Sequence, residues 1–289
     1  MLTRLAVALL WLLQLMPLPL LAAIGDGLGR LAYLIARRRR RVALVNLHLC
    51  FPQLSEAERT KLARRHFRAL MRSMLERGLC WWASEDRVRR LVRIEGLEHL
   101  RALQGQPLIL LVPHFVGLDL AATRLALEIN AVSIYANQKD PLLNKLLYHG
   151  RTRFGDQYIV SRQDGMRQVI RAVREGRPLY YLPDMDYGPR DAIFVPFFGV
   201  STATVPGVSR LARMTGAKVL PCIARMLAGG RGYVLEIHEP WGAFPGESVE
   251  ADTRRMNAYI ERQVTRMPEQ YYWVHKRFKT RPPGEPRPY

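Results

Sequence analysis

The chain begins with a long apolar run. No charged residue occurs between Leu5 and Gly25, and the segment LAVALLWLLQLMPLPLLAAIG is dominated by leucine and alanine. A helix of this length would extend about 30 Å, which is the thickness of the hydrocarbon core of a bilayer. Pro17 and Pro19 lie in its middle and are expected to kink or end a helix. The pattern predicts a hydrophobic segment that enters a membrane and is interrupted at the two prolines.

A second apolar stretch, residues 28–36, leads directly into the arginine cluster, residues 37–41. Basic residues at a membrane boundary favour the cytoplasmic side and anionic headgroups. A cleaved signal peptide fits poorly, because the arginine cluster follows the apolar stretch, whereas the positive charges of a signal peptide precede it. We expect residues 1–36 to form an N-terminal membrane anchor that makes few core contacts and either spans the bilayer or inserts partway. A buried core helix is the alternative.

From residue 107 onwards, short apolar runs alternate with amphipathic stretches. The run LILLV (108–112) has no polar position, as expected for a strand buried on both faces. Further strands are expected at 132–136, 158–160, 179–182, 219–223 and 233–237, and helices at 117–130, 141–154, 164–175, 205–215 and 250–267. This alternation predicts an α/β fold in which a mostly parallel central sheet is flanked by helices. Residues 37–289 would form this domain.

One further helix precedes the alternating region. Ser55 and Glu58 have the spacing of a capping box, and Leu62, Phe67, Leu70 and Met74 then share one helical face. Trp81 and Trp82 follow this helix. The two tryptophans suit either a membrane interface or a protein core.

Composition narrows the class of protein. The 44 Lys and Arg residues exceed the 25 Asp and Glu residues and give a net charge of +19. The electrostatic field of such a charge attracts nucleic acid, anionic lipid or an acidic protein. The apolar N-terminus favours lipid over nucleic acid. The three cysteines, Cys50, Cys80 and Cys222, form no CxxC pair, which excludes a disulfide scaffold and a zinc ribbon.

The strongest candidate for chemistry is a histidine that follows the buried strand. His114 follows LILLV after a single residue, Pro113, and Asp119 lies five positions further, in the first turn of the next helix. The intervening turn could fold the carboxylate back onto the imidazole, and a His held by a carboxylate is a general base. The alternative is that both residues only cap a strand–helix turn. Their position at a strand end, where open α/β sheets keep their sites, favours function.

Two other segments carry candidate residues. Asp184, Asp186 and Arg190 follow the strand at 179–182, and Arg151 lies near the end of the helix at 141–154. An arginine there could cap helix carbonyls or hold a phosphate or oxyanion. The chain contains no G-x-S-x-G elbow, Walker loop, G-x-G-x-x-G motif after a strand or HExxH motif. No metal site is expected.

These segments, in this order, resemble the secondary (late) acyltransferases of lipid A biosynthesis. The resemblance rests on NLHLCFP (46–52), HFVGLDL (114–120), GR (150–151), YLPDMDYGPR (181–190), FVPFFGVSTAT (194–204) and MPEQYYWVHKRFKTRPPG (267–284). It extends from about residue 40 to the end of the chain. It implies an enzyme at the cytoplasmic face of the bacterial inner membrane. Such an enzyme transfers an acyl chain from acyl carrier protein to the 3-hydroxyl of an acyl chain on a lipid A precursor. The resemblance implies no cofactor.

The resemblance also implies roles for the candidate residues. His114 would be the general base, Asp119 its carboxylate partner and Arg151 the arginine near the thioester oxygen, while Asp184, Asp186 and Arg190 would contact substrate. Many family members have Glu at the position of Asp119, and YANQKDP (135–141) lacks the YRP of the best-known members. The acyl position, the chain length and the oligomeric state therefore stay open.

Other functions remain as alternatives. An enzyme of the same fold could acylate another glycolipid or a glycerophospholipid. A basic nucleic-acid-binding protein would show a helix-turn-helix or stacking aromatic residues, which this sequence lacks. A membrane scaffold without catalytic function would leave the acids at the strand ends unexplained.

Overall fold

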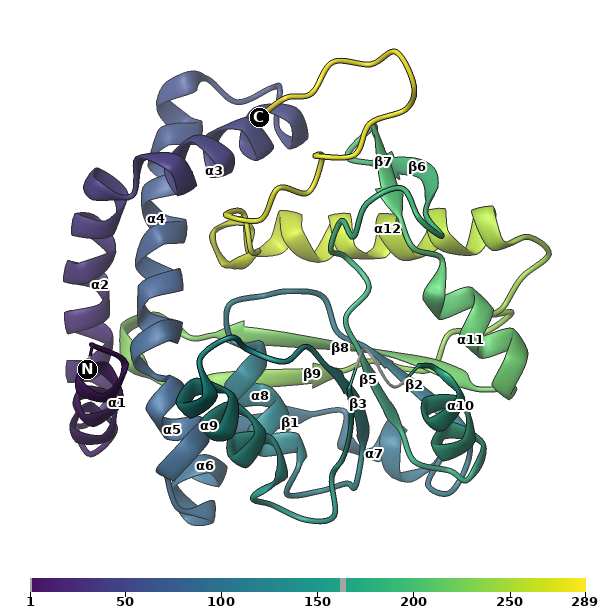
Figure 1. The fold of residues 1–289 in the computed structure, drawn as a ribbon, viewed down its shortest axis with the longest axis horizontal. Coiled ribbons are helices and arrows are strands. Elements are labelled where there is room, and N and C mark those ends of the chain that lie inside the picture. The colour runs from purple at the N-terminus through teal and green to yellow at the C-terminus, as the bar shows by residue number, and fades with distance from the viewer. Residues whose placement is uncertain (1, 162–164) are drawn as a thin grey trace.

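The central element of the fold is an open, twisted β-sheet. The computed structural model describes residues 2–161 and 165–289 (Figure 1). Within these residues, seven strands pair in the order β1-β9-β8-β2-β5-β3-β4. Their bounds are β1 Val92–Glu95, β2 Leu108–Leu111, β3 Val132–Tyr135, β4 Tyr158–Ser161, β5 Leu179–Tyr181, β8 Lys218–Met226 and β9 Tyr233–Ile237. All neighbours run parallel except β8 and β9. The predicted α/β fold with a mostly parallel sheet is confirmed.

Helices cover both faces of this sheet (Figure 1). One face packs against α8 (Leu118–Leu125), whose buried residues share a hydrophobic cluster with β2, β8 and β9. The opposite face packs against α10 (Arg167–Arg174), α11 (Gly207–Thr215) and α12 (Val249–Arg266). α9 (Pro141–Thr152) lies beside α8, and α5 (Arg77–Trp82), α6 (Glu85–Leu91) and α7 (Leu97–Arg101) complete this side. The predicted start of α10 at residue 164 lies outside the described residues.

Three strands, β1, β6 (Ile193–Phe197) and β7 (Val200–Thr204), were not predicted from the sequence. β1 is a charged edge strand, VRIE. β6 and β7 form a separate hairpin whose turn residues, Phe198 and Gly199, both have positive φ angles of 50° and 76°. Such turns suit the twist of a hairpin but usually contain Asn or Asp with Gly, and the phenylalanine hides this signal.

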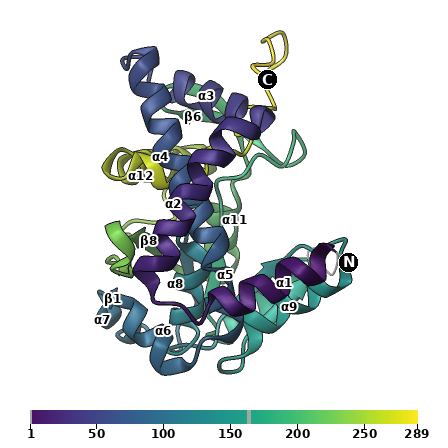
Figure 2. The same ribbon diagram turned by 90° about the vertical axis from the view of Figure 1, so that its left-hand side faces the viewer.

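The N-terminal segment forms two helices. α1 (Leu2–Leu13) and α2 (Leu18–Ile35) are separated at the prolines, and α3 (Arg37–Cys50) begins with the arginine cluster. α2 lies along α4 (Glu56–Leu75), as Figure 2 shows. Its Leu18, Leu21 and Tyr33 belong to the main hydrophobic core. The expectation that residues 1–36 make few core contacts is therefore wrong.

Close packing of α2 on α4 depends on small residues. A side chain at Gly29 would place its Cβ 2.7 Å from the carbonyl oxygen of Phe67, and one at Gly25 would lie 2.8 Å from the Cα of Arg72. Asp26 of α2 also forms an ion pair with Arg68 of α4. The two helices therefore approach each other more closely than side chains would allow.

The helix after the anchor follows its prediction closely. Ser55 and Glu58 form both hydrogen bonds of the capping box of α4. Phe67 is buried in the predicted apolar face, but Met74 at its end is 40% exposed. Trp81 is buried in the core rather than placed at the surface.

Candidate active site

A cavity of about 870 Å³ opens at the carboxyl ends of β2, β3 and β5. Its lining residues form one group on each face of the sheet, because successive residues of a strand point to opposite faces. We call the first the α8 arm; its walls are Leu118, Ala122, Leu125, Ala126, Ile129, Ala131, Ser133 and Ile159. We call the second the α11 arm; its walls are Ile134, Tyr181, Val205, Gly207, Arg210, Leu211 and Met214. His114, just after β2, also lines the cavity.

His114 is held by two hydrogen bonds to one carboxylate. Its ring Nδ1 lies 2.6 Å from Oδ1 of Asp184, and its backbone N–H donates to Oδ2 of the same residue over 3.0 Å. Asp184 follows β5, which pairs with β2, so the two strand ends bring the residues together. The predicted partner was Asp119. The structure corrects this prediction, since the carboxylate on the imidazole is that of Asp184.

Burial and hydrogen bonding determine the charge of Asp184. Its side chain is 1% exposed, and this burial opposes ionisation, but the His114 ring and backbone N–H lower the pKa of the carboxyl below its ordinary value. An ionised Asp184 accepts the hydrogen bond and therefore holds the proton of a neutral His114 on Nδ1. The lone pair of Nε2 is then free to accept a proton.

Asp119 faces the same cavity but binds an arginine instead. Nη2 of Arg77, which begins α5, donates to Oδ2 of Asp119 over 2.7 Å. Burial raises the pKa of Asp119, but Arg77 and then Arg151 outweigh it and bring the pKa below its ordinary value. Asp119 is thus an ionised carboxylate between two cations. It lies near the imidazole of His114, but that ring forms its hydrogen bond with Asp184.

The C-terminal segment fixes the loop that carries Asp184. Asp186 accepts hydrogen bonds from the N–H and hydroxyl of Thr280 and from the N–H of Gly188, and its own N–H donates to Nε2 of His275. Burial lowers the pKa of His275 to about 4, so this ring is neutral. Asp186 is 2% exposed and does not line the cavity. The sequence predicts that Asp186 contacts substrate, whereas in this structure protein groups occupy its carboxylate.

The predicted arginines reach the cavity from different elements. Arg151, near the end of α9, has its guanidinium carbon 5.5 Å from the centroid of the Tyr135 ring. Its neighbour Arg153 instead donates to the carbonyls of Ala83 and Leu79. Arg153 therefore caps the carboxyl end of α5, whereas Arg151 lines the cavity. Arg190 also lines the cavity.

Sequence comparison identifies the family. The family model "Bacterial lipid A biosynthesis acyltransferase" matches residues 1–280. The chain belongs to this family. A lipid A biosynthesis lauroyltransferase of Escherichia coli K12 is 36% identical over 100% of the chain and 94% of its own length. A lipid A biosynthesis myristoyltransferase of the same organism is 34% identical over 94% of the chain and 83% of its length.

A solved structure gives a weaker likeness. The crystal structure of a 1-acyl-sn-glycerophosphate acyltransferase from Thermotoga maritima covers 80% of this chain and 98% of its own, with 16% identity and a TM-score of 0.39. At this level the likeness adds nothing to the assignment. The family assignment itself makes this protein a lipid A biosynthesis acyltransferase and confirms the resemblance found in the sequence.

Sequence reasoning missed two cavity residues of this acyltransferase. Arg77 begins α5, which comes before the first strand of the sheet in the sequence, and Arg210 lies on α11. No local motif marks either residue. Only the packing of α5 and α11 against the strand ends places them beside the cavity.

Proposed function

We propose that this acyltransferase moves a fatty acyl chain from acyl carrier protein to the 3-hydroxyl of an acyl chain on a lipid A precursor. The observation that carries the proposal is the His114–Asp184 pair, whose histidine lines a cavity with apolar walls from both faces of the sheet. A reaction between two lipids needs one site for each hydrocarbon chain and a base where they meet. His114 occupies that position.

The reaction requires only proton transfers and acyl transfer. Nε2 of His114 removes the proton of the acceptor hydroxyl as its oxygen forms a bond to the thioester carbon. Asp184 stabilises the imidazolium that results. The carbon–sulfur bond then breaks, and the thiolate of the carrier takes up the proton from His114. An ester and a thiol are formed, and neither a metal nor a cofactor is needed because the thioester is already activated.

Arg151 and Asp119 would complete the site. The guanidinium of Arg151 is exposed to the cavity and suits the oxyanion that develops on the thioester carbonyl. Asp119 and Arg77 hold each other in place beside it. The ionised Asp119 would keep both arginines oriented towards the reacting carbonyl.

The α8 arm suits the donor chain. The lining residues on this side run from Asp119 to Ile129, along α8 and the turns after it. At the rise of a helix, this segment is about 15 Å long. An extended alkyl chain with bonds of about 1.5 Å advances roughly 1.25 Å per carbon, so about 12 carbons would fit. This length supports a medium-chain donor, as in the lauroyltransferase and myristoyltransferase relatives.

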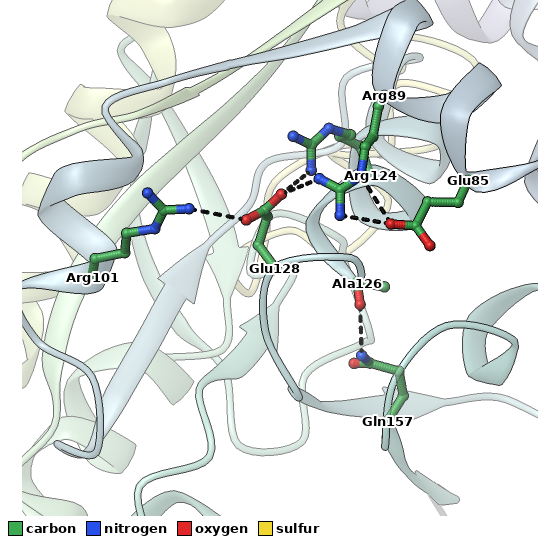
Figure 3. Close-up of polar contacts among 7 residues, drawn as sticks. All are labelled: Glu85, Arg89, Arg101, Arg124, Ala126, Glu128 and Gln157. Atoms are coloured by element: carbon green, nitrogen blue, oxygen red, sulfur yellow. Dashed lines mark hydrogen bonds and ion pairs between the residues drawn. The ribbon is translucent and has the colours of Figure 1, made fainter.

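A polar network surrounds the far end of this arm (Figure 3). The side-chain amide of Gln157 donates to the carbonyls of Ala126 and Ile129 and accepts from the N–H of Ala131. Behind it, Glu128 forms ion pairs with arginines of α6, α7 and α8, namely Arg89, Arg101 and Arg124. These contacts fix the end of the arm, which favours one chain length over longer ones.

The exposed apolar side chains of α1 and α2 support a place at the membrane. The most exposed are Leu5, Leu9, Leu12, Leu15, Leu31, Leu34 and Ile35. α2 is the described helix that is long and apolar enough to cross a bilayer. However, α2 packs along the arginine-rich α4 and carries an ion pair, which favours a position at the membrane surface over a full span.

The arginine cluster gives this surface an orientation. Residues 37–41 occupy the first turn of α3, where the positive end of the helix dipole disfavours cations. Anionic lipid headgroups would compensate this repulsion. We therefore place the enzyme on the cytoplasmic face of the bacterial inner membrane, where its positive charge would also attract the acidic acyl carrier protein.

The direct test is an acyl-transfer assay with the full chain in detergent micelles. Purified lipid A precursor is incubated with acyl carrier proteins that carry chains of 8 to 18 carbons, and mass spectrometry records the products. We expect one added acyl group and fastest transfer near 12 carbons. A chain that acylates only glycerophospholipid or another glycolipid, and leaves the lipid A precursor unchanged, would contradict the proposal.

A further inference from the structure

The α11 arm differs from the α8 arm in both shape and charge. Leu211 is buried in its wall, and Val205 and Ile134 provide further apolar surface. Met214, at its outer side, is 45% exposed, so this arm opens to solvent. A single enclosed hydrocarbon chain would not need such an opening.

Two further arginines line the cavity, one of them on the α11 arm. Arg190 follows β5 and Arg210 lies on α11, and both are exposed. Among the described residues, neither guanidinium has an ion-pair or hydrogen-bond partner, whereas Arg77 in the same cavity binds Asp119. Asp191 also lines the cavity but forms no ion pair with them. Arginines with unoccupied donors suit phosphate, which accepts two parallel hydrogen bonds from one guanidinium.

We propose that the α11 arm is the binding site for the acyl acceptor, with the hydrocarbon tail on Val205 and Leu211 and a phosphate of the sugar on Arg210 and Arg190. This inference rests on the proposed function and assigns the second substrate a place within the same cavity. It makes Arg210, which no motif in the sequence marks, a determinant of acceptor specificity.

The chemistry of the two substrates supports this division. The donor carbonyl ends a single hydrocarbon chain, which suits the apolar walls of the α8 arm. The acceptor hydroxyl lies partway along its chain, so an apolar tail extends from it in one direction and a phosphorylated sugar in the other. The α11 arm offers apolar wall and unpaired cations together. Because the arms lie on opposite faces of the sheet, hydroxyl and thioester can meet only at the strand ends, beside His114.

The test separates the two substrates kinetically. Transfer is measured for the full-length protein and for Arg210→Ala, with lipid A precursor before and after removal of its phosphates by a phosphatase. We expect Arg210→Ala to raise the KM for the phosphorylated acceptor about tenfold, since a charge-assisted hydrogen bond is lost. The KM for the dephosphorylated acceptor and the KM for acyl carrier protein should stay unchanged. Arg171→Ala, an exposed arginine on the adjacent α10, is the matched control.

A second variant tests the apolar wall. Val205→Phe narrows the arm and should raise the KM for both acceptors without changing the KM for the donor. A higher KM for acyl carrier protein in Arg210→Ala would instead assign this surface to the carrier and overturn the inference. An unchanged KM for the phosphorylated acceptor would overturn it as well. If the proposed function itself were wrong, the unmodified enzyme would not acylate the lipid A precursor, which is a distinguishable failure.

Discussion

At the scale of single residues, the site combines acids and cations with different tasks. Asp184 orients His114, Asp119 pairs with Arg77, and Asp186 holds the loop through Thr280. Three carboxylates that look alike in the sequence thus have three different partners. The mechanism depends on this separation, because only one of them can fix the proton of the imidazole.

Arg151 provides a test of oxyanion stabilisation. Arg151→Lys keeps the charge but loses the planar fork, so we expect activity to fall about tenfold or more while the melting temperature stays nearly constant. Arg153→Lys is the contrast, because Arg153 binds the carbonyls of Ala83 and Leu79 and should affect stability more than turnover. Full activity of the Arg151→Lys enzyme would exclude the oxyanion role.

His66 should make the fold sensitive to acid. The residue is fully buried, its Nδ1 bonds to the carbonyl of Glu269, and its burial lowers the pKa to about 4. Between about pH 6.5 and pH 4 the unfolded chain binds a proton that the folded chain does not, so stability falls as pH falls, by about 3 kcal/mol for this shift.

Thermal unfolding at pH 7.5 and pH 5 measures this effect. The melting temperature should fall between these two pH values, and His66→Gln, which cannot titrate, should show a smaller fall. An equal fall in both proteins would mean that His66 does not contribute. A contribution of His275 should remain in the variant, because burial lowers the pKa of this residue to about 4 as well.

At the scale of elements, strand and helix patterns predicted most of the fold. LILLV, Pro141 at the start of α9 and Gly216 in a left-handed conformation after α11 all lie where the pattern places them. The pairing of His114 with Asp184 could not be predicted in this way. The two residues are 70 positions apart, and the order of the strands in the sheet decides which acid reaches the ring.

The packing of α2 on α4 gives a prediction with a matched control. Gly29→Ala should force the helices apart and destabilise the protein by about 1–3 kcal/mol, because its Cβ would collide with the backbone of α4. Gly27 lies in the same helix with no atom near its missing Cβ, so Gly27→Ala should be neutral or stabilising. Equal melting temperatures for the two variants would show that α2 is a detachable anchor.

At the scale of the whole molecule, hydrophobic and charged surfaces suggest how the enzyme meets its substrates. The exposed leucines of α1 and α2 and the arginine cluster at the start of α3 are continuous in sequence. The same segment contributes to the core through Leu18 and Leu21. The composition predicts an affinity for anions. That the same segment also contributes to the core could not be predicted in this way, because this depends on α4, which covers one side of the segment.

Binding to lipid vesicles tests the contribution of the arginines. Replacement of residues 37–41 by glutamine should weaken binding to vesicles that contain anionic lipid much more than binding to neutral vesicles, since each arginine near such a surface contributes about 1 kcal/mol. A co-sedimentation assay with both vesicle types measures the difference. Equal loss on both would mean that the cluster does not contact headgroups.

We propose that His114 is the general base and that Asp184 holds its proton on Nδ1. The most direct measurement is the turnover number of His114→Ala, Asp184→Asn and the double variant in the acyl-transfer assay, with folding checked by circular dichroism. Each single variant should lose about 10²- to 10⁴-fold in turnover, and the double variant should be little worse than His114→Ala, because the two residues act as one unit. Near-normal transfer by a folded His114→Ala enzyme would contradict the mechanism, and near-normal transfer by Asp184→Asn would contradict the pairing.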